Sequence, residues 1–288
     1  MRRVLQRPGA AQRFEPAVAP ALRVLQRVGA APQLEPAVAL ALRARCVRES
    51  VRFAARELLR SRAVAVYHAR AGGMALVIRH GSADVVTLGE VFHRPDYEPP
   101  PQVAALLDGR DLRILDLGAN VGLFGAFAAG RWPRAHLTAV EPDPANLAVL
   151  RRCVQLSGRA AAWEVVEAAA AAADGTVAFQ GGGESLSRIE PGSAGRVAAI
   201  DVLPLVDGVD LLKMDIEGGE WAILDDPRFA ASAPAVTVLE YHPHLCPHPV
   251  PRTAVEAVFA RAGMQIHTIF ARDDGHGMLW AWRSAAPG

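Results

Sequence analysis

From Leu112 onward, the sequence alternates short apolar runs with amphipathic segments, and this alternation constrains the fold more than any other feature. We predict strands at RILDLG, HLTAVEP, EVVEAAA, DLLKMDI and AVTVLEYH, a hairpin arm at TVAF, and a closing hairpin of QIHTIF and MLWAWR. We predict helices at GLFGAFAAGR, PANLAVLRRCVQL, GEWAILDD and TAVEAVFARAG. Such alternation is typical of an α/β fold with a doubly wound, mostly parallel sheet covered on both faces, here with an antiparallel C-terminal hairpin. Ligands of such sheets bind at the carboxyl ends of the strands, where the winding direction switches.

The predicted organisation has three parts: an extension over residues 1–62, a β-rich entry region over residues 63–110, and the α/β domain over residues 111–288. The extension carries thirteen arginines and four glutamates, a net charge of +9, and its residues 4–23 recur as residues 24–43 with fifteen of twenty positions identical. Pro36 is a suitable first residue for one long basic helix through residue 61. The extension is interpreted either as a surface that contacts a membrane or partner, or as a loosely ordered duplication.

The entry region is rich in β-forming residues. The runs AVAVYHAR, MALVIRH and DVVTLGEVF are separated by glycine-containing turns and closed by three prolines at 99–101. This pattern predicts a small antiparallel region.

Composition excludes several function classes. The whole chain has a net charge of +1, so no overall positive field favours nucleic acid. No apolar run reaches the 18 or more residues that a membrane-spanning helix needs, and the N-terminus lacks the apolar region of a signal peptide. Three widely spaced cysteines imply no disulfide framework, so we predict a cytoplasmic protein.

A glycine-containing loop follows the first predicted strand of the α/β domain. Gly118, Asn120 and Gly122 lie where a loop enters a helix, and glycines let the backbone approach a ligand closely. The loop lacks the G-x-G-x-x-G spacing of dinucleotide-binding proteins. Asp116, two residues before the first glycine, would repel a pyrophosphate but suits a ligand with an amine and a sulfonium.

The second predicted strand ends at Glu141, 23 residues after Gly118. A carboxylate at this place can accept both hydroxyls of a ribose. The acidic loop and Glu141 together favour S-adenosylmethionine over NAD as the cofactor. The alternatives are that Asp116 caps a turn or helix and that Glu141 belongs to a solvated turn before Pro142.

The motifs DLGANVG, AVEPDPANL and LLKMDIEGGEWAIL resemble those of the FkbM-type family of S-adenosylmethionine-dependent methyltransferases. Lys213 through Glu220 match the family's run of a lysine, an apolar residue and D-x-E-G-x-E, although Gly219 stands where alanine is common. The segments 84–100 and 240–242 also resemble the family, and the resemblance covers roughly residues 75–283. It implies a class I methyltransferase fold and, commonly, O-methylation of a hydroxyl on a sugar or a secondary metabolite.

An alcohol is a poor nucleophile until its proton leaves, so a base within hydrogen-bond reach is expected. Asp215, predicted at the carboxyl edge beside the glycine loop, is the first candidate and His242 the second. Lys213 is expected to hold a neighbouring carboxylate or the acceptor in position. Glu217, Glu220, Glu240 and Tyr97 are further candidates for contacts with the acceptor or for structural support. Tyr97 and Phe92 are expected either to line the other wall of the acceptor pocket or to pack within the entry segment.

Other interpretations of these acids stay open. Asp215 can cap the helix that follows, and Glu217 and Glu220 can complement its dipole. A divalent ion held by Asp215, Glu217 and Glu240 is a further alternative, whereas the histidines and cysteine of EYHPHLCPHP lack a common zinc spacing. We therefore predict a site without a metal, with the 240–249 segment as a loop over the acceptor pocket.

The predicted function is S-adenosylmethionine-dependent methylation of a small hydroxylated molecule. The alternative is a catalytically inactive, methyltransferase-like module that docks on a partner through residues 1–62. An NAD-dependent enzyme is disfavoured by the missing G-x-G-x-x-G spacing.

Overall fold

The computed structural model describes residues 31–182 and 187–283, so most of the duplicated segment predicted at 4–43 lies outside the described residues. The chain divides into two units, residues 1–41 and residues 42–288. Every strand within the described residues lies in the second unit, which is described below.

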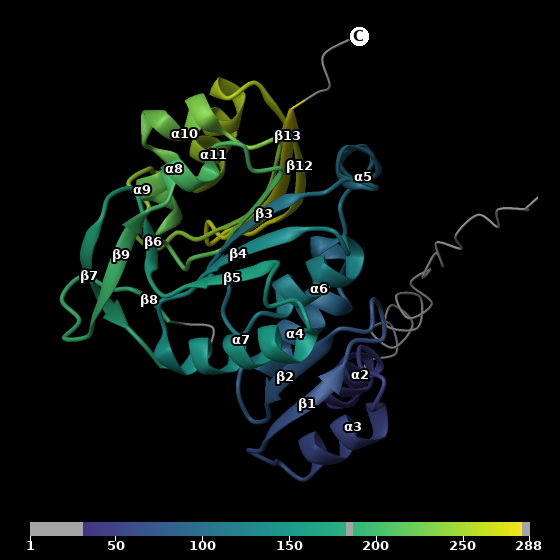
Figure 1. The fold of residues 1–288 in the computed structure, drawn as a ribbon. Coiled ribbons are helices and arrows are strands. Elements are labelled where there is room, and N and C mark those ends of the chain that lie inside the picture. The colour runs from purple at the N-terminus through teal and green to yellow at the C-terminus, as the bar shows by residue number, and fades with distance from the viewer. Residues whose placement is uncertain (1–30, 183–186, 284–288) are drawn as a thin grey trace, which may run out of the picture. The chain divides into compact units, whose positions relative to one another are not determined.

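Its centre is a seven-stranded sheet in the order β12-β13-β11-β10-β3-β4-β5 (Figure 1). The strands are β3 Arg113–Leu117, β4 His136–Val140, β5 Trp163–Val166, β10 Leu211–Met214, β11 Val236–Tyr241, β12 Met264–Ala271 and β13 Gly277–Arg283. Neighbours from β5 to β11 run parallel, and β13 runs antiparallel to both β11 and β12. The predicted doubly wound sheet with a C-terminal antiparallel hairpin is confirmed, and β3 and β10 meet at its switch point.

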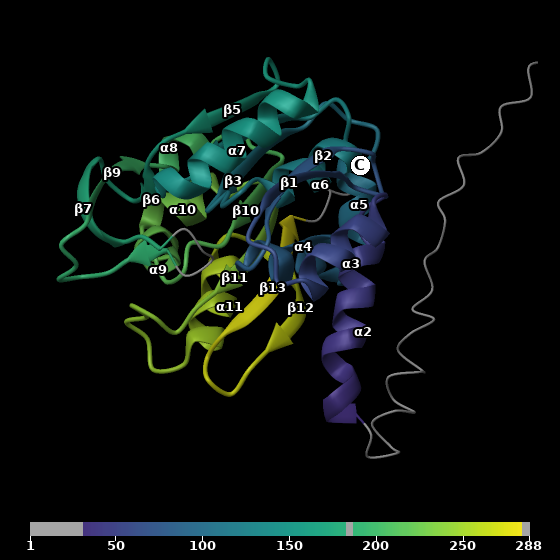
Figure 2. The ribbon, with the colours of Figure 1, turned by 90° about the horizontal axis from the view of Figure 1, so that it is seen from below.

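Helices cover both faces of this sheet (Figure 1). One face carries α8 Leu203–Val206, α9 Glu220–Leu224, α10 Pro227–Ser232 and α11 Pro251–Arg261, and the other carries α4 Asp84–Phe92, α6 Leu123–Arg131 and α7 Pro144–Ser157. Under the first group, Leu115, Leu212, Phe229 and Phe259 are among the buried residues of one apolar core. Figure 2 shows β5 and β12 at the two opposite edges of the sheet.

A second, four-stranded sheet was not predicted as such. It consists of β6 Ala169–Ala171, β9 Arg196–Asp201, β7 Gly175–Gln180 and β8 Arg188–Ile189, in that order. The single strand predicted at EVVEAAA is wrong, because its first half is β5 beside β4 and its second half is β6 beside β9. Strand propensity in a continuous run gives no information on where the run changes partner.

The entry region contains the predicted hairpin, β1 Val64–His68 paired antiparallel with β2 Ala75–Arg79. The strand predicted at DVVTLGEVF is wrong, because this segment is helix α4. Val85 and Leu88, three residues apart, are both buried on one helical face. A 3₁₀ turn, Pro95–Tyr97, and helix α5 Pro101–Leu107 complete this region.

The predicted long basic helix is interrupted. The structure has α2 Ala31–Arg45 and α3 Ser50–Leu58, and Pro36 lies inside α2 instead of starting it. Between the two helices, Val47 forms a β-bridge with Ala69 and the Arg48 N–H donates to the His68 carbonyl at 2.9 Å. Pairing with the β1 hairpin therefore competes with helical hydrogen bonds at this point. Within the described segments, no helix is both long enough and apolar enough to cross a membrane.

Candidate functional site

The glycine loop after β3 adopts a conformation that its glycines permit. Gly118 and Gly122 have φ angles of +76° and +85°. The N–H groups of Gly118 and Ala119 both donate to the Val140 carbonyl at 3.0 Å, which ties the loop to the end of β4. A Cβ on Gly118 would lie 1.9 Å from the Asp215 carbonyl oxygen, so the loop packs directly on the segment that follows β10.

A cavity of about 310 Å³ opens at this carboxyl edge of the sheet. Its wall joins the glycine loop, the ends of β4, β10 and β11, the turn before β13, helix α4 and the second sheet. The polar and aromatic wall residues used below are Glu90, Tyr97, Asn120, Glu141, Lys213, Asp215, Glu217, Glu240, His242 and His276. The cavity thus lies at the predicted switch point.

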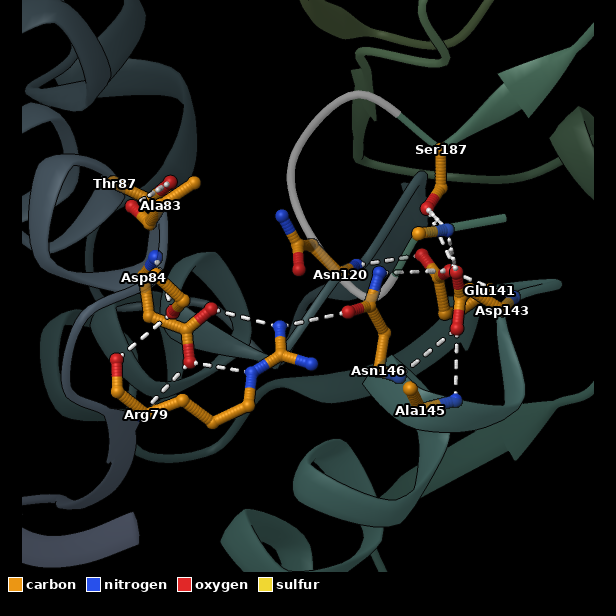
Figure 3. Close-up of polar contacts among 12 residues, drawn as sticks. Arg79, Ala83, Asp84, Thr87, Asn120, Glu141, Asp143, Ala145, Asn146 and Ser187 are labelled. Carbon is orange, nitrogen blue, oxygen red and sulfur yellow. Dashed lines mark hydrogen bonds and ion pairs between the residues drawn. The ribbon is translucent and has the colours of Figure 1, made fainter. Parts of the chain in front are cut away.

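Glu141 is fixed in one orientation at the glycine-loop end of the cavity (Figure 3). One carboxylate oxygen, Oε2, accepts from the Asn120 N–H at 2.8 Å, and Oε1 accepts from the Asp143 N–H at 2.9 Å and from Asn146 Nδ2 at 3.3 Å. Burial raises the pKa of Glu141, although the N–H donors of Asp143 and Asn120 oppose that rise. The carboxylate is therefore held rigidly beside the loop, where the sequence predicted the ribose site.

The polar network around Glu141 extends to helix α4 (Figure 3). Arg79 Nη2 donates to Asn146 Oδ1 at 2.8 Å and to Asp84 Oδ1 at 2.8 Å. On the other side, Ser187 Oγ donates to Asp143 Oδ2 at 2.7 Å. The entry region, helix α7 and the second sheet are thus linked by charge-assisted hydrogen bonds around one end of the cavity.

Asp116 lies beneath the glycine loop rather than on the cavity wall. Its side chain is fully buried, and Lys213 Nζ lies 3.2 Å from its Oδ1. Lys213 also donates to the Gly118 carbonyl at 2.7 Å. Burial by itself lowers the pKa of Lys213, but Asp116 and Asp215 outweigh that effect and raise it. Asp116 therefore does not line the cavity itself. It pairs with the charged Lys213, which lines the cavity and holds the glycine loop.

Glu220 organises the turn between β10 and α9. Its side chain is fully buried; Oε1 accepts from the Ile216 N–H at 3.0 Å and Oε2 from the Gly218 N–H at 2.9 Å. Oε1 also lies 3.0 Å from His242 Nδ1. The Glu220 carboxylate therefore holds the turn before α9 through two backbone N–H groups, and the same carboxylate sets the orientation of the His242 ring.

Two imidazoles stack at the other end of the cavity. The rings of His242 and His276 lie 4.7 Å apart at an interplanar angle of 22°, and His276 Nε2 lies 2.8 Å from Glu240 Oε1. Burial alone lowers the pKa of His242, but hydrogen bonding to Glu220 and nearby carboxylates raise it to about 10. Burial, followed by repulsion from Asp215, raises the pKa of Glu217 to about 7.

Sequence reasoning missed several wall residues, among them His276 and Glu90. His276 comes from the turn before β13, and only the register that pairs Gly277 with Tyr241 brings it beside β11. Glu90 belongs to α4, which had been predicted as a strand. Helical periodicity over 85–92 would have placed Glu90 on a defined face.

The aromatic candidates differ in position. Tyr97 is buried on the cavity wall with its ring 5.4 Å from that of Phe124, and burial raises its pKa well above the usual value. Phe92 packs instead against Phe127, at a ring distance of 6.1 Å. Tyr97 therefore offers the cavity a neutral phenol.

The remaining histidines of the 240–249 segment point to separate partners. His244 Nε2 lies 3.5 Å from Glu190 Oε2, and His248 Nε2 lies 2.9 Å from Asp225 Oδ1. Cys246 Sγ donates to the His248 carbonyl at 3.4 Å. The four His and Cys side chains of this segment thus do not converge on one point.

The strand order, the closing antiparallel hairpin and the cavity at the switch point define a class I methyltransferase fold. Residues 116–254 match the model of the methyltransferase FkbM domain. This match confirms, for residues 116–254, the resemblance to the FkbM-type family that was stated from the sequence.

Solved structures with a similar fold include three methyltransferase-related proteins. Methyltransferase FkbM from Methylobacillus flagellatus KT is 18% identical with a TM-score of 0.45, covering 69% of this chain and 53% of its own. Precorrin-6y C5,15-methyltransferase from Geobacter metallireducens GS-15 is 16% identical with a TM-score of 0.38, covering 63% and 85%. TYW2 of M. jannaschii, solved with AdoMet, is 12% identical with a TM-score of 0.42, covering 76% and 84%. This chain thus spans about half the length of the Methylobacillus protein, and no curated protein matches its sequence.

Proposed function

We propose that this protein is an S-adenosylmethionine-dependent methyltransferase that methylates a hydroxyl group of a small molecule. The methyltransferase family assignment of residues 116–254 supports the reaction class. The observation that best supports S-adenosylmethionine as the cofactor is the Glu141 carboxylate, which backbone N–H groups hold against the glycine loop on the cavity wall. The acids at the opposite end of the same cavity support an acceptor whose proton must be removed.

The residues at the glycine-loop end fit this cofactor. Gly118 has no side chain where the loop packs against the Asp215 carbonyl, so its backbone stays accessible to a ligand. Asn120 Oδ1 is buried without a hydrogen-bond partner among the described residues. Glu141 offers two oxygens to the ribose hydroxyls. Two basic residues of the cavity wall are already paired, Lys213 with Asp116 and the Gly118 carbonyl and Arg188 with Glu190, which disfavours a pyrophosphate. S-adenosylmethionine would supply a methyl group on a positively charged sulfur, and acidic surroundings favour such a charge.

Asp215 is the proposed acceptor of the hydroxyl proton. It follows β10 on the cavity wall, and one of its oxygens lies within 4.8 Å of a His242 ring nitrogen. Lys213 Nζ lies 3.8 Å from Asp215 Oδ2 and also holds the glycine loop, so the base and the cofactor loop share one anchor. Holding the acceptor and the methyl group in near-attack geometry would supply most of the acceleration.

Calorimetric titration tests the cofactor directly. S-adenosylmethionine and, separately, NAD are titrated into the wild type, Glu141→Ala and the exposed matched control Glu164→Ala. We expect the wild type and the control to bind S-adenosylmethionine, and Glu141→Ala to bind at least about tenfold more weakly, about 1.4 kcal/mol. Tighter binding of NAD, or equal affinity in all three proteins, would refute the assignment.

The reaction is tested by S-adenosylhomocysteine formation with a panel of hydroxylated and aminated acceptors. We expect turnover with a hydroxylated compound, and a loss of turnover in Asp215→Asn with cofactor affinity retained. Turnover with amines alone would replace O-methylation by N-methylation.

A docking role is the second candidate, and exposed apolar side chains on α3 and at its C-cap favour it. Val51, Leu58 and Leu59 are 85%, 72% and 81% exposed, and the same helix carries Arg52 and Arg56. Deleting residues 1–43 and, separately, the double variant Val51→Ser with Leu58→Ser separate the two functions. Lost partner binding with intact cofactor affinity would support docking, whereas unchanged behaviour in both assays would count against it.

A further inference from the structure

Two imidazoles and one carboxylate converge at the acceptor end of the cavity. Glu240 lies near the end of β11 and His242 directly follows that strand, so the two alternate residues turn their side chains to the same side, where both line the cavity. His276 joins them from the turn before β13. One ligand atom of each residue lies within 4.8 Å of the other two, and all three line the cavity.

The orientation of His242 is set in the way that is common for metal ligands. A metal-bound histidine usually gives its other ring nitrogen to a carboxylate, which fixes the ring. His242 Nδ1 is held by the fully buried Glu220, and Nε2 faces Glu217 Oε2 at 3.5 Å. Glu220 itself is occupied by the N–H groups of Ile216 and Gly218, so it acts as the orienting group.

The charge at this end of the cavity suits a cation. Four carboxylates line it, those of Glu90, Asp215, Glu217 and Glu240. Like charges at such short range in a partly buried site repel one another, and a divalent ion offsets that repulsion. Two imidazoles with a carboxylate are a donor set for Zn²⁺ and other divalent transition metals, whereas Mg²⁺ and Ca²⁺ prefer oxygen alone.

We propose that Glu240, His242 and His276 bind one divalent transition-metal ion, with an open coordination position facing the cavity. This set differs from the Asp215, Glu217 and Glu240 set that the sequence suggested, because folding brings His276 beside β11. The role of the ion rests on the proposed function: it binds the acceptor's hydroxyl oxygen and favours transfer of that proton to Asp215. Asp215 is close enough for this role, since its oxygen lies within 4.8 Å of His242.

Metal binding is measured on the full chain after chelator treatment and dialysis, independently of turnover. Co²⁺ is titrated by its visible absorption and Zn²⁺ by calorimetry. We expect one ion per chain in the wild type, at least about a 100-fold loss of affinity in His276→Ala and Glu240→Gln, and a 10- to 100-fold loss in Glu220→Gln. His248→Ala is the matched control, because His248 pairs with Asp225 outside the cluster, and its affinity is expected to be unchanged.

Thermal unfolding of each variant accompanies the titrations, and His276→Gln replaces His276→Ala if the latter fails to fold. The proposal is overturned if the wild type binds no stoichiometric ion, or if the variants of His276, Glu240 and Glu220 all bind the ion as the wild type does. Titration of S-adenosylmethionine into the same samples separates the two hypotheses. Cofactor binding without metal binding would refute only the ion site, and metal binding without cofactor binding would refute only the methyltransferase assignment.

Discussion

The two ends of the cavity differ in how their polar groups are satisfied. At the glycine-loop end, the Glu141 carboxylate takes hydrogen bonds from backbone and amide N–H groups of its own βα unit and of the glycine loop that follows the neighbouring strand β3. At the acceptor end, the His242 and His276 rings face carboxylates from separate segments of the chain. The first end is therefore stabilised by local backbone geometry, and the second depends on charge balance between distant segments.

The largest expected effect comes from removing the cation between the two ends. Lys213→Ala leaves Asp116 buried and unpaired, so we expect the free energy of unfolding to fall by about 3–5 kcal/mol. Urea denaturation measures this. The double variant Lys213→Met with Asp116→Asn is expected to lose less than the sum of its two single variants. Additive losses would show that the pair does not interact.

A smaller loss is expected when the glycine loop is disturbed. Gly118→Ala adds a Cβ that overlaps the Asp215 carbonyl and strains a positive φ, so we expect about 3 kcal/mol lower stability and lost cofactor binding. Gly109→Ala is the control, because its φ is +77° but a Cβ there meets nothing within 4 Å. It should cost about 1–2 kcal/mol and leave cofactor affinity unchanged. Equal losses would mean that strain alone, and not the close approach, requires glycine.

The third prediction separates the ends by function. Glu220→Gln weakens the hold on His242 without touching Glu141, so we expect turnover to fall by roughly 100-fold while cofactor affinity stays within about twofold of the wild type. Steady-state kinetics and calorimetry on the same preparation measure the two quantities. A parallel fall in cofactor affinity would show that the two ends are not independent.

The smallest expected effect is the pH dependence of cofactor binding. Burial raises the pKa of Glu141 above its usual value of 4.5, and only the ionised carboxylate accepts from both ribose hydroxyls. Affinity should therefore be full at neutral pH and fall as the pH drops through that raised value. Calorimetry between pH 7 and pH 5 checks this. The Glu141→Gln variant is expected to bind the cofactor weakly, with an affinity that hardly changes over this pH range. A wild-type profile as flat as that of the variant would exclude Glu141 as the titrating group.

Sequence reasoning succeeded where the interactions are local. The strands and helices from β3 to α7, the glycine loop and Glu141 were all placed from periodicity and spacing, because each depends on residues close in the chain. It failed at α4, where apolar β-formers follow a helical period, and at EVVEAAA, where one apolar run serves two sheets.

The sequence by itself determined the doubly wound α/β class, the switch-point loop with Gly118 and the position of Glu141. Only the tertiary structure decided that Lys213 neutralises Asp116 and that Glu220 orients His242. It alone brought His276, 34 positions after His242, into the same cavity. The physical reason is range: hydrophobic period and glycine conformation act over a few residues, whereas the charge partners of a buried site come from segments that meet only when the sheet is complete.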